Sequence, residues 1–253
     1  MSTQKSIKLS NYIEYPFHIP TINLDFNITR DYVVVQASML IKPKLNESSK
    51  LILQGNHIKL LKISIDGDAL DSSEYILKDD KLIISNPPKS EFLLKIKSKI
   101  DPYRNTSLEG LYLSDGMLTT QCEAEGFRRI CYHPDRPDVL SKYTVRIEAD
   151  RFLFPILLSN GNSKYSGILN TNKNRHEIVW EDPFPKPSYL FALVAGKLKR
   201  VSGNYITSSG RSIDINIYVE SGDEKYTQHA INSLKKAMKW DEDKYNLEYD
   251  LDE

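Results

Sequence analysis

Strict alternation of apolar and polar residues is the feature that most constrains how this chain folds. The apolar residues fall at every second position in four segments of the first three quarters of the chain: residues 22–28, 33–41, 92–100 and 143–147. Such alternation puts one set of side chains on a core and the other in water, which is typical of antiparallel sheets. No helical period of useful length appears before residue 220. We therefore predict a mostly β protein whose first part is an antiparallel β-sandwich or saddle.

A change of pattern near residue 195 predicts a domain boundary. Residues 181–187 read Glu-Asp-Pro-Phe-Pro-Lys-Pro, and three prolines so close together exclude a regular helix or a central strand. The near-continuous apolar run that follows, residues 189–195, suits a strand buried on both faces. We predict a β-rich amino-terminal domain over residues 1–195 and the beginning of a second, incomplete domain over residues 196–253.

The second domain begins with a strand and one helix. Residues 213–219 alternate again. Ser-Gly-Asp at residues 221–223 is a candidate helix cap, and apolar residues then recur at helical spacing as Ala230, Leu234, Ala237 and Met238. We predict a helix from about residue 224 to residue 240 with this stripe as its apolar face.

Charge and composition exclude several classes of protein. Lys plus Arg and Asp plus Glu both number 34, so the basic excess of a nucleic-acid-binding protein is missing. No signal-peptide-like run and no apolar stretch of ~20 residues occurs, so we expect no membrane partner and a cytoplasmic location. The two cysteines, Cys122 and Cys131, are too few for a disulfide framework, and we expect free thiols.

The segment that can carry chemistry is residues 120–129, Thr-Gln-Cys-Glu-Ala-Glu-Gly-Phe-Arg-Arg. On a strand, Gln121 and Glu123 would point to the same face, and Glu125 would join them unless the following glycine turns the chain. A carboxylate beside a carboxamide can receive an ammonium group. The two arginines could neutralise or orient these carboxylates. From spacing alone, a solvated polar turn is the favoured interpretation of the segment.

Several long and irregular segments resemble the aminopeptidase N family of zinc metallopeptidases, and its bacterial alanyl aminopeptidases in particular. Gln-Cys-Glu-Ala-Glu-Gly-Phe-Arg-Arg and the later Asp-Arg-Pro-Asp are similar to the signature of that family's first domain. The other similar segments follow the family order from Tyr15 to Asp252: residues 15–20, 182–196 and 233–242.

The resemblance implies a specific function. Members of the family release amino-terminal residues from peptides, and their β-saddle first domain caps a thermolysin-like α+β catalytic domain, which would begin at residue 196. By the family pattern, Glu123 binds the free α-amine of the substrate and Gln121 lines the pocket for its first side chain. A Gly-Ala-Met-Glu-Asn motif that completes this site would come after residue 253.

The chain carries no zinc-binding motif of the His-Glu-x-x-His type, in which two histidines one helical turn apart share the metal. Its histidines are isolated from one another: His18, His57, His133, His176 and His229. We therefore expect zinc in a longer parent enzyme and none on this segment, which would be inactive alone. The expected partners are peptides with a free amino terminus, and we expect a monomer.

Two other functions fit the residues without the resemblance. A β-sandwich rich in tyrosine could be a non-catalytic module that binds carbohydrate or protein. Glu123 and Glu125 could instead be the two carboxylates of a glycosidase, although such pairs flank a sugar at ~5–9 Å and neighbouring glutamates fit that spacing poorly.

Overall fold

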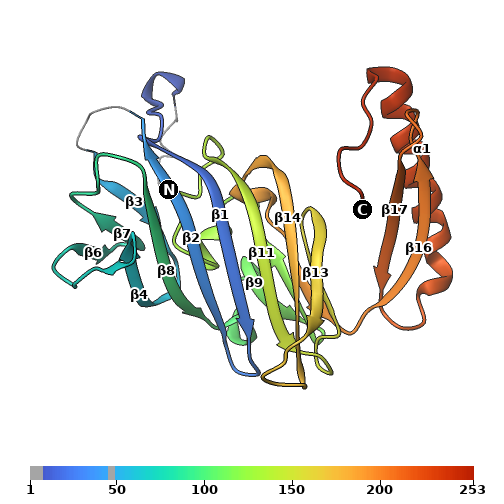
Figure 1. Cartoon of the computed structure of the whole chain (residues 1–253), viewed down its shortest axis with the longest axis horizontal. Coiled ribbons are helices and arrows are strands. Elements are labelled where there is room, and N and C mark those ends of the chain that lie inside the picture. The colour runs from blue at the N-terminus through green and yellow to red at the C-terminus, as the bar shows by residue number, and fades with distance from the viewer. Residues whose placement is uncertain (1–7, 45–48) are drawn as a thin grey trace, which may run out of the picture.

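The computed structural model of the chain describes residues 8–44 and 49–253. Residues 1–7, in which the sequence shows no signal-peptide-like run, lie outside the described residues. An eight-stranded sheet dominates the fold and is seen face-on in Figure 1. In spatial order its strands are β13 (Asn162–Ile168), β14 (Arg175–Pro187), β11 (Leu140–Asp150), β1 (Phe17–Ile28), β2 (Val33–Pro43), β8 (Phe92–Ile100), β4 (Lys59–Ile65) and β5 (Asp68–Ala69).

Two smaller sheets complete the amino-terminal part. One has four strands in the order β12 (Ile156–Ser159), β15 (Leu193–Gly196), β10 (Met117–Gln121) and β9 (Gly110–Ser114). The other has three, in the order β3 (Leu51–Gln54), β7 (Lys81–Ile84) and β6 (Tyr75–Lys78). One short 3-10 turn, η1 (Leu9–Asn11), comes before β1, and three others lie between strands: η2 (Pro102–Arg104), η3 (Phe127–Arg129) and η4 (Ser188–Leu190).

The core lies between one face of the large sheet and the two smaller sheets. Alternate residues of β1, β2, β8 and β11 point into it. Their apolar side chains belong to one buried cluster with residues such as Leu53, Leu118 and Leu193. These inward positions are the ones that the alternation predicts, so the mostly β fold is confirmed. A tight turn joins the paired strands β4 and β5, where Asp66 and Gly67 both have positive φ.

One strand pair differs from the predicted antiparallel arrangement. β1 pairs with β2 in antiparallel fashion on one side but with β11 in parallel on the other, in a register that includes Leu24 with Val145. Parallel neighbours need a long crossover, and here the chain between β1 and β11 builds the whole three-stranded sheet and two strands, β9 and β10, of the four-stranded one. Period-2 alternation indicates a half-buried strand but carries no information on the direction of its neighbours.

The proline-rich stretch is extended, and the apolar run after it is only partly a strand. β14 continues through the prolines to Pro187, but β13 pairs with it only as far as Glu181, so residues 182–187 form an edge that needs few N–H donors. In residues 189–195, η4 comes first, and only the four residues of β15 form a strand, which lies between β12 and β10.

The carboxyl-terminal part is a hairpin and one α-helix, at the right of Figure 1. β16 (Lys199–Ile206) pairs with β17 (Ser212–Val219) in a two-stranded sheet, and η5 (Glu224–Tyr226) leads into α1 (Thr227–Tyr245). The structure does not test the predicted domain boundary. Asp223 of the predicted cap lies at the N-cap position of η5, but among the described residues no side chain makes a capping hydrogen bond to η5 or α1. Among the described residues no helix has the length and apolar character needed to cross a bilayer.

The predicted apolar stripe of α1 is not its buried face. Ile231 is buried against the hairpin, where a Cβ on Gly203 would lie 3.1 Å from its side chain. Leu234 is 43% exposed, and Ala230 and Ala237 are exposed as well. Helical spacing predicted the helix correctly. It did not predict which apolar positions the hairpin covers, because the hairpin covers a narrow face of the helix.

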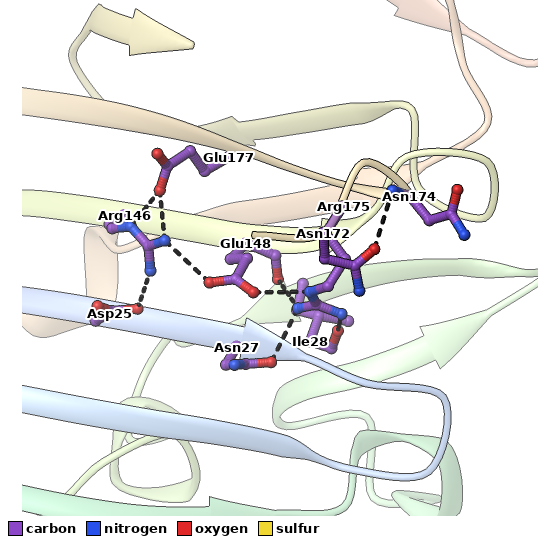
Figure 2. Close-up of polar contacts among 9 residues, drawn as sticks. All are labelled: Asp25, Asn27, Ile28, Arg146, Glu148, Asn172, Asn174, Arg175 and Glu177. Atoms are coloured by element: carbon purple, nitrogen blue, oxygen red, sulfur yellow. Dashed lines mark hydrogen bonds and ion pairs between the residues drawn. The ribbon is translucent and has the colours of Figure 1, made fainter. Parts of the chain in front are cut away.

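Charged side chains on the face of the large sheet opposite the core are tied together across three strands, as Figure 2 shows. Arg146 on β11 contacts Asp25 at 2.9 Å, Glu148 at 2.9 Å, and Glu177 on β14. Arg175 reaches Glu148 at 2.7 Å. Burial alone would raise the pKa of Glu148, but the hydrogen bonds from Arg175 and Arg146 outweigh it and lower that pKa. We call these five residues the outer-face network.

Candidate functional site

The segment predicted to carry function is a turn at the end of a strand. β10 ends at Gln121, residues 123–126 form a turn, and η3 begins at Phe127. The premise that Gln121 and Glu123 share one strand face is therefore wrong. They are nevertheless brought together, because the Gln121 side-chain amide donates to the backbone oxygen of Glu123 at 3.1 Å. We call residues 121–129 the recognition loop.

Glu123 presents its carboxylate to solvent. The residue is exposed, its peptide bond to Ala124 is cis, and none of the described residues forms an ion pair or hydrogen bond with its carboxylate. Glu125, two residues later, is paired with Arg128 at 3.1 Å. The two glutamates are thus not equivalent: one is engaged by a guanidinium, whereas the other can accept hydrogen bonds from a ligand.

The loop is held closely from below. The Gly126 amide donates to the Cys122 backbone oxygen at 2.8 Å. A Cβ at Gly126 would lie 2.3 Å from the Gln121 oxygen and 2.9 Å from the Gly110 nitrogen. Only glycine fits this approach of backbone to backbone, so the turn that ends the predicted face of glutamates is fixed by a steric requirement.

A buried layer of side chains supports the loop. Cys122 and Cys131 are free thiols, as predicted, and burial raises the pKa of Cys122 to about 12, so neither is an activated nucleophile. The His133 ring meets that of Phe127 edge-on at 5.1 Å, and burial lowers the His133 pKa to about 4. The neutral imidazole accepts at Nδ1 from the Asp135 amide at 3.0 Å.

Three charged residues of this region were missed or only partly interpreted from the sequence. Arg129 pairs with Glu109 at 3.0 Å. Arg128 pairs with Glu125, as the sequence suggested, but also with the fully buried carboxylate of Asp135 at 2.8 Å. Asp135 belongs to the Asp-Arg-Pro-Asp motif, so the resemblance marked the segment without indicating a role for the residue.

The described residues do not fit a metal ion. They contain no group of three or more His, Cys, Asp and Glu side chains gathered closely enough to bind one. His133 is buried, and His176 contacts the Phe154 backbone oxygen at 2.7 Å. A hollow of about 780 Å³ is lined by Tyr103, Met117 and Lys197, among others, but by neither Gln121 nor Glu123.

Residues 13–190, well over half of the chain, match the Peptidase M1 N-terminal domain family. This chain belongs to that family. The Peptidase M1 N-terminal domain described here is 46% identical over 250 residues to Aminopeptidase N of Caulobacter vibrioides, an alignment that covers 99% of the chain and 28% of the relative. The predicted resemblance is thus confirmed, and the chain spans little more than a quarter of the length of this relative.

Two solved structures of longer chains superpose on this one. A crystal structure of Legionella pneumophila aminopeptidase A in complex with aspartic acid superposes with a TM-score of 0.90 at 37% identity, covering 97% of this chain and 29% of that one. An M1 zinc metallopeptidase of Deinococcus radiodurans bound to a Tyr-Ser-Ala substrate has a TM-score of 0.68 over 82% of this chain and 48% of its own. At 14% identity, the second structure shows the shared fold alone.

Proposed function

We propose that this chain is the amino-terminal part of a longer zinc aminopeptidase and that it supplies part of the site that recognises a peptide's free amino terminus. Aminopeptidase N of Caulobacter vibrioides and Legionella pneumophila aminopeptidase A support this proposal, since this chain aligns with little more than a quarter of the length of each. The two alternatives, a glycosidase and a stand-alone binding module, have no support from the family.

In this proposal Glu123 receives the substrate ammonium and Gln121 borders the first side chain. The observation that carries it is the Glu123 carboxylate, which is exposed and unpaired among the described residues although the loop around it is held in place. A carboxylate carried on a well-held backbone orients an ammonium group better than one on a mobile loop, because less conformational freedom is lost on binding. The Gln121 amide, by holding the Glu123 backbone, contributes to the same orientation.

Zinc belongs to this proposal only through the longer enzyme. The described residues do not fit the ion, so its ligands would lie in sequence beyond this chain, and the segment alone would not hydrolyse peptides. The metal would supply the polarisation of the peptide bond. This domain would contribute the placement of the substrate's amino terminus, the recognition of peptides with a free α-amine and the exclusion of blocked ones.

The test is Glu123→Gln in the longer enzyme. A charge-assisted hydrogen bond contributes roughly 1.5–3 kcal/mol, so we expect kcat/KM for free-amine peptides to fall about ten- to a hundred-fold. The matched control is Glu181→Gln, an exposed glutamate of β14 outside the recognition loop, which should leave kcat/KM unchanged. An unchanged kcat/KM in Glu123→Gln would remove Glu123 from the proposal.

A further inference from the structure

Asp135 is the most completely enclosed charge near the recognition loop. Its side chain is wholly buried, and its backbone adopts a left-handed conformation with φ of 47°. Oδ2 accepts from the Arg128 backbone amide at 3.1 Å and from Arg128 Nε at 2.8 Å, while Oδ1 accepts from Ser188 Oγ at 2.7 Å. Both oxygens are therefore used, and the donors come from two segments, one seven and one 53 residues away along the chain.

Arg128 transmits this anchorage to the loop. Its guanidinium lies between two carboxylates, because Nε faces Asp135 while Nη1 faces Glu125 at 3.1 Å. Glu125 is only two residues from Glu123. With the backbone bond between Gly126 and Cys122, this pair leaves little freedom to the turn that carries the Glu123 carboxylate.

The same chain segment holds the other end of the loop. Thr120, just before the loop, accepts at Oγ1 from the Leu193 amide at 2.9 Å. Ser188, five residues before Leu193, is the residue that donates to Asp135. Asp135 thus joins the far end of the recognition loop to the segment that already holds its near end, and the loop is clamped on both sides of Glu123.

We infer that Asp135 is a positioning residue for amino-terminus recognition: it clamps Arg128 and Ser188 together and thereby fixes the place of the Glu123 carboxylate. The inference rests on the proposed function, because it assigns Asp135 a role only through Glu123. Asp135 is buried beneath the loop and does not touch the substrate. If Glu123 must meet an ammonium group whose position is set elsewhere, a small displacement weakens that contact and leaves the other substrate contacts intact.

The test uses Asp135→Asn in the longer enzyme and two inhibitors that differ only in the α-amine, alanine hydroxamate and propanoyl hydroxamate. We expect the inhibition constant of alanine hydroxamate to rise about tenfold and that of propanoyl hydroxamate to change less than twofold. For a free-amine substrate KM should rise about as much, with a smaller change in kcat. A purely structural role would weaken both inhibitors alike or neither, and either result would overturn the inference.

A matched control is Asp25→Asn, which removes a carboxylate paired with Arg146 at 2.9 Å on the opposite face of the large sheet. It should leave both inhibition constants unchanged. If Asp135→Asn does not fold, Ser188→Ala removes only the hydroxyl that donates to Oδ1, and it should weaken alanine hydroxamate selectively by about threefold. A Ser188→Ala enzyme with both constants unchanged would then refute the clamp.

Glu123→Gln separates this inference from the proposed function. If it fails to weaken alanine hydroxamate selectively, the proposed role of Glu123 falls and the inference falls with it. If it does so but Asp135→Asn does not, the inference alone is wrong. If both do, the double variant decides: a residue that acts through Glu123 should add little to the loss already caused by Glu123→Gln. Fully additive losses would contradict the clamp.

Discussion

The outer-face network and the recognition loop both contain carboxylates and guanidinium groups, but the two regions differ in whether every carboxylate is paired. In the network each carboxylate has a guanidinium partner, and Glu148 has two. In the loop Glu125 is paired with Arg128, whereas the carboxylate of Glu123 has no partner among the described residues. Paired charges stabilise the sheet on which they lie, whereas an unpaired carboxylate on a well-held loop is available to a ligand.

The difference teaches that the loop is ordered by groups other than the one it presents. Gly126 lets the backbone fold onto itself, and Asp135 holds Arg128 from beneath. Neither touches solvent to any extent. This comparison can be tested by variants that disturb the support of the loop and by variants that remove charges from the sheet. The expected effects differ in size.

The largest effect is expected at the backbone contact of the recognition loop. In Gly126→Ala the new Cβ would lie within 3 Å of two backbone atoms, neither of which can rotate away. We expect the free energy of unfolding to fall by about 3 kcal/mol, as measured by denaturant titration. The control is Gly116→Ala, where φ is +78° but nothing lies within 4 Å, so only the backbone strain of about 1 kcal/mol remains. Equal losses in the two variants would show that the loop is not tightly held.

The buried histidine beneath the loop predicts an effect of similar size on stability in mild acid. Its pKa is about 4 in the folded chain, because of burial, against ~6.5 in the unfolded chain. Between these values the unfolded state binds more protons than the folded state. The contribution of His133 to the free energy of unfolding is therefore fully present above pH ~6.5 and is lost toward pH 4, by about 3 kcal/mol in all. The measurement is the free energy of unfolding across this range, compared between the wild type and His133→Asn.

The control for that titration is His18→Asn, since His18 is exposed. It should keep the wild-type slope, whereas His133→Asn should flatten it. If all three proteins lose stability in parallel between pH 6.5 and 4, His133 is not the group responsible, and the support of the loop is less enclosed than its burial indicates.

Much of the fold could be predicted because alternation reports burial directly. The inward residues of β1, β2 and β8 are those the pattern selects. The parallel pairing of β1 with β11 could not be predicted, since it depends on which segments meet after the intervening chain has folded. The exposed stripe of α1 was mispredicted for a related reason: helical spacing shows that an apolar face exists, but the partner decides which face is covered.

For the candidate site, the residue types were visible but their spatial relations were not. Spacing brought Gln121 and Glu123 together on a strand that in fact ends at Gln121. The resemblance singled them out for a different reason, and their roles stay predictions. The part played by Asp135 needed the structure, because it depends on Ser188, which is 53 residues away along the chain.

A smaller effect is expected from Glu148→Gln in the outer-face network. Its carboxylate, 14% exposed, accepts from both Arg146 and Arg175, and the amide can satisfy only one of them well. We expect the free energy of unfolding to fall by about 2 kcal/mol. Glu181→Gln is the control, since Glu181 is 48% exposed and 3.6 Å from Lys164, and it should change stability by less than about 0.5 kcal/mol. A Glu148 variant as stable as the control would mean that the network contributes little to the sheet.

The smallest effect on stability is expected where the proposed effect on recognition is large. Glu123→Gln removes a charge that is exposed and has no partner among the described residues, so the free energy of unfolding should change by less than about 0.5 kcal/mol. The measurement is the same denaturant titration, run beside Glu148→Gln. A loss approaching that of Glu148→Gln would mean that Glu123 has a structural partner after all. It would then belong with the paired charges of the sheet, and the contrast between the two regions would disappear. If Glu123→Gln leaves stability unchanged but lowers kcat/KM as proposed, Glu123 is a carboxylate available to a ligand, in contrast to the paired carboxylate of Glu148.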